Sequence, residues 1–172
     1  YGFSSITVPV ALLFYTNRIL NPALVLVELV INGYVLFINR KSIPTIWWRV
    51  APILIGLVVG VATGSYILSL VHPAWVKFVT YIMLLPLILL QAAGIRKPIQ
   101  AEKAIAIPFG IGIGTLYSVT TISGPPLAVL FNNQGYAKQD FRAALGVIRV
   151  AEGVFTGIAY YVIGLYSYES MA

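Results

Sequence analysis

Three ionisable residues lie inside stretches of the sequence that are otherwise apolar. Arg149 and Glu152 are three residues apart within 141–166, and Glu28 lies within 22–39. A charge at the centre of a membrane helix costs at least about 2.5–3.5 kcal/mol, so pairing or function must justify it. Residues three apart share a helical face, so Arg149 and Glu152 could simply neutralise each other. Alternatively, Arg149 contacts an anion while Glu28 or Glu152 carries a coupling proton, because a carboxyl removed from water holds its proton more readily.

A break in the apolar run between Lys103 and Lys138 is the second chemical feature. The sequence Ser-Gly-Pro-Pro at 123–126 interrupts this run. A helix cannot pass through it unbroken, because neither proline donates a backbone hydrogen bond and each disfavours α geometry in the preceding residue. Hydrocarbon cannot satisfy freed backbone groups, so such a break requires partners from protein or a water-filled cavity. We expect a polar solute to be held there.

Half-helices that begin inside a membrane suit an anion, because they present unpaired N–H groups and the positive end of the helix dipole. We expect one such helix at 127–131, directly after two prolines, and another at 10–15, after Pro9. Neighbouring hydroxyls could donate to the same anion, or each could bond a carbonyl of its own helix. The candidate substrate-binding residues are Ser4, Ser5, Thr7, Thr120, Thr121, Ser123, Gly124, Pro125, Asn132 and Arg149.

Polar residues beyond the break could form an access route. Asn132 and Asn133 either cap the broken helix or line this route. Arg142 lies seven residues before Arg149 on the same helical face, and with Lys138 it could draw anions inward from the loop.

The composition identifies an all-α, multi-pass membrane protein. Of the 172 residues, 59% are hydrophobic and 9% are charged, whereas soluble domains carry about a quarter charged residues. The eleven Lys and Arg residues mostly lie in short gaps between apolar runs, so the net charge of +6 reflects topology and not nucleic-acid binding. The absence of cysteine excludes disulfides, thiolate metal sites and cysteine nucleophiles. We expect no metal site and no cofactor.

The apolar runs define the spans. We predict membrane helices at 22–39, 50–70, 74–94 and 141–166, and a broken helix pair at 104–132. As one helix, residues 104–132 would reach about 43 Å, well beyond a hydrocarbon core of about 30 Å. Two half-length helices fit, and a strongly tilted, interrupted crossing is the alternative. Within 50–70, Gly56, Gly60 and Gly64 recur every fourth residue, which predicts close helix packing.

An internal repeat is indicated when residue 1 is aligned with residue 117. Tyr1 then falls on Tyr117 and Pro9 on Pro125, with apolar residues matching between them. We therefore expect two repeats. The first covers 1–100 with its N-terminal part missing, and the second, incomplete, covers 101–172.

Charge counts favour inverted repeats with broken or re-entrant helices at their interface. Six cations, at 40, 41, 49, 96, 97 and 103, lie on one side of the predicted spans, and two, at 18 and 77, lie opposite. The richer side should be cytoplasmic. If 104–132 is re-entrant, the repeats are inverted, and if it crosses, they are parallel. We favour the re-entrant arrangement.

A family resemblance rests on these same residues. The sequence SGPPLAVLFNNQGYAKQDFRAALGVIRV, residues 123–150, resembles the second-repeat signature of the sulfite exporter TauE/SafE family. In that family a Gly/Pro-rich break, an apolar stretch, Asn-Gln-Gly and a loop with Phe-Arg follow in this order. GFSSITVPVALL matches the first repeat, although Ser4 and Ser5 stand where the family usually has glycine. The resemblance implies export of small anions, typically sulfite, thiosulfate or organosulfonates, across the bacterial cytoplasmic membrane.

The alternatives are a channel, another transporter with a broken-helix site, and an intramembrane enzyme. Ser123-Gly124 is similar to the nucleophile motif of a rhomboid-like protease, but that chemistry needs a general base within reach. The one histidine, His72, lies in a connection beside Pro73, and no lysine occupies a span centre. We therefore expect a secondary anion transporter and no enzyme. Its expected partners are a small inorganic or organosulfonate anion and the lipid bilayer, and a homodimer is a possible assembly.

Overall fold

The computed structural model describes residues 3–92 and 102–166, and every regular element in these two ranges is helical. The α-helices are α1 (Phe3–Ala11), α2 (Asn17–Ile38), α3 (Ile43–Leu70), α4 (Pro73–Ala92), α5 (Glu102–Thr120), α6 (Gly124–Asn133) and α7 (Lys138–Val162). A short 3-10 helix, η1 (Arg40–Ser42), joins α2 to α3.

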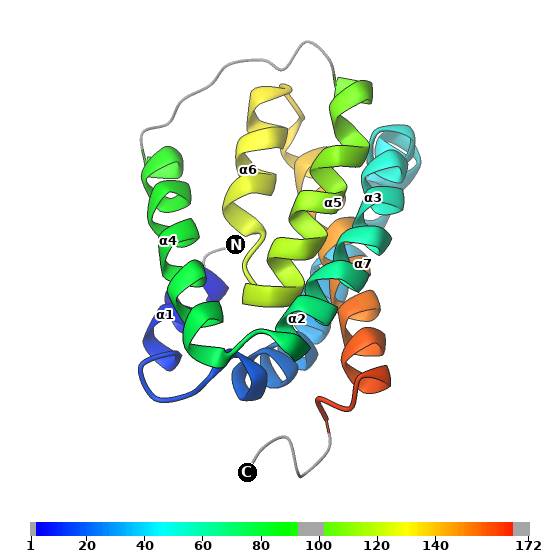
Figure 1. Cartoon of the computed structure of the whole chain (residues 1–172). Helices are drawn as coiled ribbons and strands as arrows, with labels where there is room; N and C mark the ends of the chain where they lie inside the picture. Colours follow the sequence, from blue (N-terminus) through cyan, green and yellow to red (C-terminus); the bar gives the residue numbers. More distant parts are fainter. Residues whose placement is uncertain (1–2, 93–101, 167–172) are drawn as a thin grey trace.

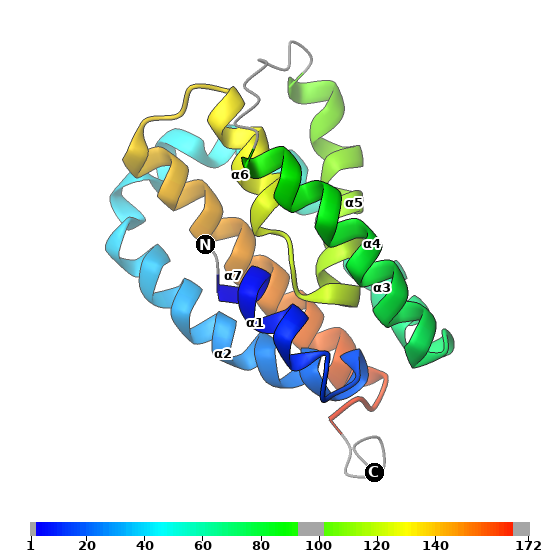
Figure 2. The same cartoon turned by 90° about the vertical axis from the view of Figure 1, so that its left-hand side faces the viewer.

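The long helices α2, α3 and α7 run along the bundle, and α5 and α6 form a hairpin against them (Figures 1 and 2). In Figure 1, α5 begins at the upper end of the bundle and runs downward, and α6 runs upward to the same end. Both views place the turn between them above the lower ends of α3 and α4. The connection between α5 and α6 therefore lies part-way along the bundle and not at its end.

Within residues 3–92 and 102–166, three helical segments are long and apolar enough to cross a membrane: Asn17–Ile38, Arg40–Leu70 and Lys138–Val162. Two of them begin earlier than predicted, at 17 instead of 22 and at 40 instead of 50, because polar and interfacial residues extend the helices beyond their apolar cores. The last ends earlier than predicted. Gly164 has φ +76, and Leu165 N donates to Tyr160 O at 2.9 Å, which is the Schellman ending of an α-helix.

The predicted half-helices differ from the observed ones. The helix expected at 10–15 is wrong, because α1 covers Phe3–Ala11 with Pro9 inside it, and a turn follows. The helix expected at 127–131 begins earlier, at Gly124, with both prolines in its opening turn. The first turn of a helix tolerates proline because its N–H groups have no intrahelical partner.

Close packing of α3 on α5 fixes the position of the hairpin, and the prediction from the glycine spacing is confirmed. A Cβ added at Gly56 would clash with Ile107 O, and one added at Gly60 would clash with Ile111 O. On the facing helix, a Cβ at Gly110 would clash with Ile53 O. Glycines on both helices thus allow backbone-to-backbone contact, which small residues provide in membrane helix pairs.

Candidate functional site

A buried ionic cluster joins α2 to α7. Arg149 Nη2 lies 3.4 Å from Glu28 Oε1, and Arg149 Nη1 lies 3.6 Å from Glu152 Oε2. The exposed fractions of Glu28, Arg149 and Glu152 are 2%, 6% and 0%. Charges this far from solvent must be compensated inside the protein. One guanidinium accordingly lies between two carboxylates, one of them from a helix that precedes it by 121 residues.

Ser123 and Tyr117 complete the cluster. The Ser123 hydroxyl donates to Glu152 Oε2 at 2.6 Å and accepts from Arg149 Nη1 at 2.9 Å. The Tyr117 hydroxyl donates to Glu28 Oε2 at 2.9 Å, and the Arg149 guanidinium lies 5.6 Å from the centroid of the Tyr117 ring. Sequence reasoning missed Tyr117, although it opens the second copy of the internal repeat. The cluster therefore draws on α2, α5, the break and α7 together.

The two prolines explain why the Ser123 hydroxyl is available to this cluster. Ser123 is the N-cap residue of α6, yet its side chain makes no capping hydrogen bond. An N-cap serine usually accepts from the N–H of the second or third helical residue. In α6 these residues are Pro125 and Pro126, which have no N–H.

The same prolines limit what α6 can offer an anion. Its opening turn carries one N–H group before Leu127, that of Gly124, and Leu127 N already donates to Ser123 O at 3.2 Å. The expectation of several unpaired N–H groups at this helix start is therefore wrong, because two of the three positions are prolines. Side chains, above all Arg149, are the donors at this break.

Side chains from α2 and α7 satisfy the carbonyls that the end of α5 leaves without helical partners. Asn21 Nδ2 donates to Val119 O at 2.6 Å, and Asn17 Nδ2 reaches the same oxygen at 3.3 Å. The Tyr160 hydroxyl donates to Ser118 O. The last carbonyls of any helix need such partners, and lipid supplies none. Sequence reasoning missed this support, although the four-residue spacing of the two asparagines places them on one helical face.

The remaining candidate residues are dispersed. Thr120 Oγ1 donates to Leu116 O at 2.7 Å and Thr121 Oγ1 to Thr120 O at 2.7 Å, so these two hydroxyls bond nearby backbone carbonyls. Gly124 and Pro125 are buried at the start of α6, whereas Asn132 is exposed near its far end. Thr7 is half-buried in α1, and Lys138 is exposed at the start of α7. The side chains of Ser4, Ser5 and Asn133 lie outside the described part of the chain.

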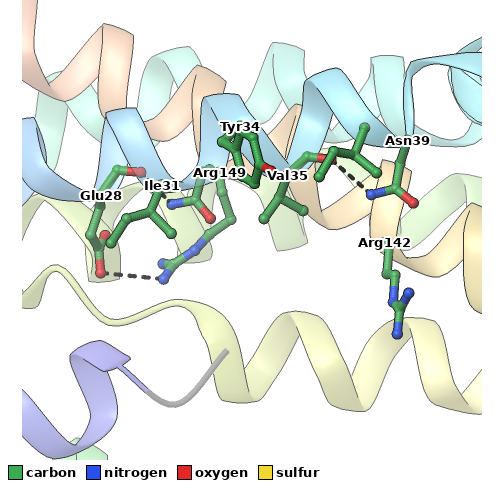
Figure 3. Close-up of a pocket in the computed structure, with 9 residues that line it drawn as sticks. Glu28, Ile31, Tyr34, Val35, Asn39, Arg142 and Arg149 are labelled. Atoms are coloured by element: carbon green, nitrogen blue, oxygen red, sulfur yellow. Dashed lines mark hydrogen bonds and ion pairs between the residues drawn. The ribbon is translucent and has the colours of Figure 1, made fainter.

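A cavity of about 320 Å³ leads to the cluster between α2 and α7 (Figure 3). Glu28 and Arg149 lie at one end of it, and Asn39 and the exposed Arg142 lie at the other (Figure 3). Neither Ser123 nor Glu152 is among the residues that line it, which are Glu28, Ile31, Asn32, Tyr34, Val35, Ile38, Asn39, Arg142 and Arg149. Among the described residues, no group of three or more His, Cys, Asp or Glu side chains could hold a metal ion. The cavity is thus mostly apolar along its walls, with the Arg149–Glu28 ion pair at its inner end and the exposed Arg142 guanidinium at its outer end.

Long apolar helices around a buried arginine–glutamate cluster define an α-helical membrane protein. The family model described as sulfite exporter TauE/SafE matches residues 1–172, and the chain belongs to this family of membrane exporters of sulfite and related anions. No curated protein and no solved structure matches the chain significantly.

Proposed function

We propose that this chain is a secondary transporter that exports a small anion, sulfite or an organosulfonate, across the cytoplasmic membrane. The observation that carries the proposal is Arg149, a buried guanidinium that faces a cavity between two spanning helices. Anions are recognised by guanidinium groups through charge-assisted hydrogen bonds, which strengthen where water is excluded. Membership of the exporter family supports the same conclusion.

The distribution of cations supports a cytoplasmic opening at the Arg142 end of the cavity. The helix ends that gather there carry Arg40, Lys41, Arg49, Lys103, Lys138 and Arg142. The opposite ends carry Arg18 and Lys77. An excess of Lys and Arg marks the cytoplasmic side of a membrane protein. Arg96 and Lys97, which were counted with the richer side, lie outside the described residues.

The proposed architecture is a pair of inverted repeats, 1–100 and 101–172, with α5 and α6 as a re-entrant hairpin. In Figures 1 and 2, α6 starts part-way along the bundle and runs to one end, whereas α1 runs to the other end. Opposed short helices of this kind support an inverted arrangement. Transporters of that class place the substrate between the two repeats near the membrane centre.

Flux of radiolabelled sulfite, thiosulfate and methanesulfonate into proteoliposomes tests the proposal. Arg149→Gln should reduce the flux of the transported anion by at least about tenfold, because losing one partner of a buried charged hydrogen bond costs about 2–5 kcal/mol. Arg40→Gln is the matched control, because Arg40 is exposed and outside the cavity lining. Undiminished flux through Arg149→Gln contradicts the arginine site. If anion on the opposite side of the membrane accelerates the flux, the protein is a carrier. If that anion has no effect on the flux and the flux carries a current, the protein is a channel.

A further inference from the structure

Polar residues continue along α7 beyond the ionic cluster, on the side away from the cavity. Thr156 and Tyr160 follow Glu152 at intervals of four residues, so the three side chains share one helical face. All three are 0% exposed, and none of them lines the cavity. Glu152, Thr156 and Tyr160 form a polar stripe, which extends from Arg149 toward the face of the protein opposite the Arg142 opening.

The polar stripe faces the broken end of α5. Glu152 at its start accepts from Ser123 in the break, and Tyr160 at its end donates to Ser118 O. Thr156 lies between them on the same face, about 6 Å along the helix from each. Irregular backbone at membrane depth occurs where it is buried in protein or borders a water-filled path. The stripe therefore runs beside the part of the chain where a path for a polar solute is expected.

The Thr156 hydroxyl has no hydrogen-bond partner among the described residues. A threonine within a helix can donate to the carbonyl three or four residues earlier, as Thr80 and Thr120 do. Leaving a buried hydroxyl unpaired is destabilising, and valine would fill the same space without that penalty. Glu152 Oε1, one turn earlier, also lacks a partner in the described part of the chain. Unpaired polar atoms in an apolar interior are explained if a polar solute reaches them in another state of the protein.

An apolar layer covers the end of the stripe at Tyr160. The Tyr160 ring is fully buried in a cluster with Val25, Leu68, Val76, Tyr117 and Leu165. Its hydroxyl is engaged with the Ser118 carbonyl. The protein thus has a cavity that leads from Arg142 to Arg149 and a closed layer beyond the stripe. Alternating access requires one open and one closed side of this kind.

We propose that the polar stripe is the exit half of the anion route, and that the contact of Tyr160 with Ser118 O closes it in this structure. The inference rests on the proposed anion transport and adds the residues that the anion meets after Arg149. The Thr156 hydroxyl donates a hydrogen bond to the passing anion, and the Tyr160 hydroxyl exchanges Ser118 O for an anion oxygen. Arg149, 3.6 Å from Glu152, offsets the carboxylate charge where the stripe begins.

Thr156→Val separates a role in the route from a structural role. Valine keeps the shape and removes the unpaired hydroxyl, so the Tm in detergent should stay the same or rise. Flux of sulfite, thiosulfate or methanesulfonate into proteoliposomes should nevertheless fall about fivefold or more, because the anion loses one hydrogen-bond donor. Thr63→Val is the matched control, since Thr63 is exposed and its hydroxyl donates to carbonyls of its own helix. Its flux should equal that of the wild type.

Thiol accessibility tests the position of the route, because the chain contains no cysteine. Spheroplasts that carry Thr156→Cys or Ile158→Cys are treated from outside with sulfonatoethyl methanethiosulfonate, an anion that does not cross the membrane. The thiol of Thr156→Cys should react at least about tenfold faster, since thiolate forms where water reaches it. Ile158 is the matched control, because it is 57% exposed on the outer surface of a spanning helix. Adding Tyr160→Phe, which removes the contact with Ser118 O, should accelerate the reaction of Thr156→Cys further.

Two results overturn the inference: a thiol in Thr156→Cys that reacts no faster than that in Ile158→Cys, and wild-type flux through Thr156→Val. An unchanged reaction rate after Tyr160→Phe contradicts the closing role of the contact with Ser118 O. If the wild-type chain carries none of the three anions, the proposed transport itself is contradicted, whereas the thiol reactions still show whether the stripe opens to water.

Discussion

The Ser123 hydroxyl donates a hydrogen bond of 2.6 Å to Glu152 Oε2, although Ser123 occupies the N-cap position of α6. It is free to do so because the two residues whose N–H groups it would cap are prolines. The Pro-Pro pair therefore starts α6 and also directs the serine hydroxyl toward the ionic cluster on α7. The break in the backbone and the buried charge are in this way parts of one arrangement.

Replacing Ser123 with alanine should destabilise the protein and impair transport. Arg149 Nη1 and Glu152 Oε2 would lose the hydroxyl that joins them and would face each other at 3.6 Å, too far for a strong direct hydrogen bond. Leaving buried polar atoms unpaired costs about 1–3 kcal/mol. We expect a lower free energy of unfolding by about that amount and a slower anion flux. Ser65→Ala is the matched control, since Ser65 is also buried but its Oγ has no hydrogen-bond partner among the described residues. Equal effects of the two substitutions would contradict the bridging role of Ser123.

Pro126→Ala should reduce transport although it removes no contact with the ionic cluster. The substitution restores an N–H at the third helical position of α6, which is the usual partner of an N-cap serine. The Ser123 hydroxyl would then accept from that N–H and reorient away from Glu152. Flux assays in a double-mutant cycle isolate this effect, because Pro126→Ala should have little influence on flux when Ser123 is already alanine. Additive losses would show that Pro126 acts in some other way.

Much of the ionic cluster could be predicted from the sequence. Glu28, Arg149 and Glu152 stand out because charges inside apolar spans are costly, and Ser123 stands out because prolines follow it. What no local pattern contains is the pairing of Glu28 with Arg149, which depends on how α2 packs against α7. Within the described residues, helices long and apolar enough to cross a membrane lie at three of the four predicted spans, 22–39, 50–70 and 141–166, because apolar length is a property of the sequence alone.

The ends of the helices, and the side chains that hydrogen-bond to unpaired backbone carbonyls, were harder to predict. Pro9 was expected to precede a helix, but it lies within α1, because a short helix can lose one backbone hydrogen bond near its end and continue. Asn17 and Asn21 resemble any polar residues at the start of a span, and their role depends on the distant Val119 carbonyl. Tertiary contacts of this kind decide which polar groups are structural and which remain available to a solute.

Gly60→Ala should be strongly destabilising, whereas Gly33→Ala should not. A Cβ at Gly60 would collide with the Ile111 carbonyl on α5, a backbone atom that cannot move aside as a flexible side chain could. Gly33 has no atom within 4 Å of such a Cβ, and in a helix interior alanine is favoured over glycine by about 0.5–1 kcal/mol. Thermal unfolding in detergent should therefore show a lower Tm for Gly60→Ala and an equal or higher Tm for Gly33→Ala. A similar Tm for both variants would contradict the close α3–α5 packing.

Arg142→Gln should weaken anion capture without abolishing transport. Arg142 is exposed at the outer end of the cavity, and seven residues separate it from Arg149, a rise of about 10 Å along α7. At that distance it cannot share an anion bound at Arg149, but its field can raise the local anion concentration at the opening. We expect the KM for flux to rise several-fold with little change in the maximal rate, and the difference from wild type to shrink as salt screens the exposed charge. Arg142→Lys, which keeps the charge, should behave nearly as wild type. A loss of maximal rate that persists at high salt would instead place Arg142 in direct contact with the transported anion.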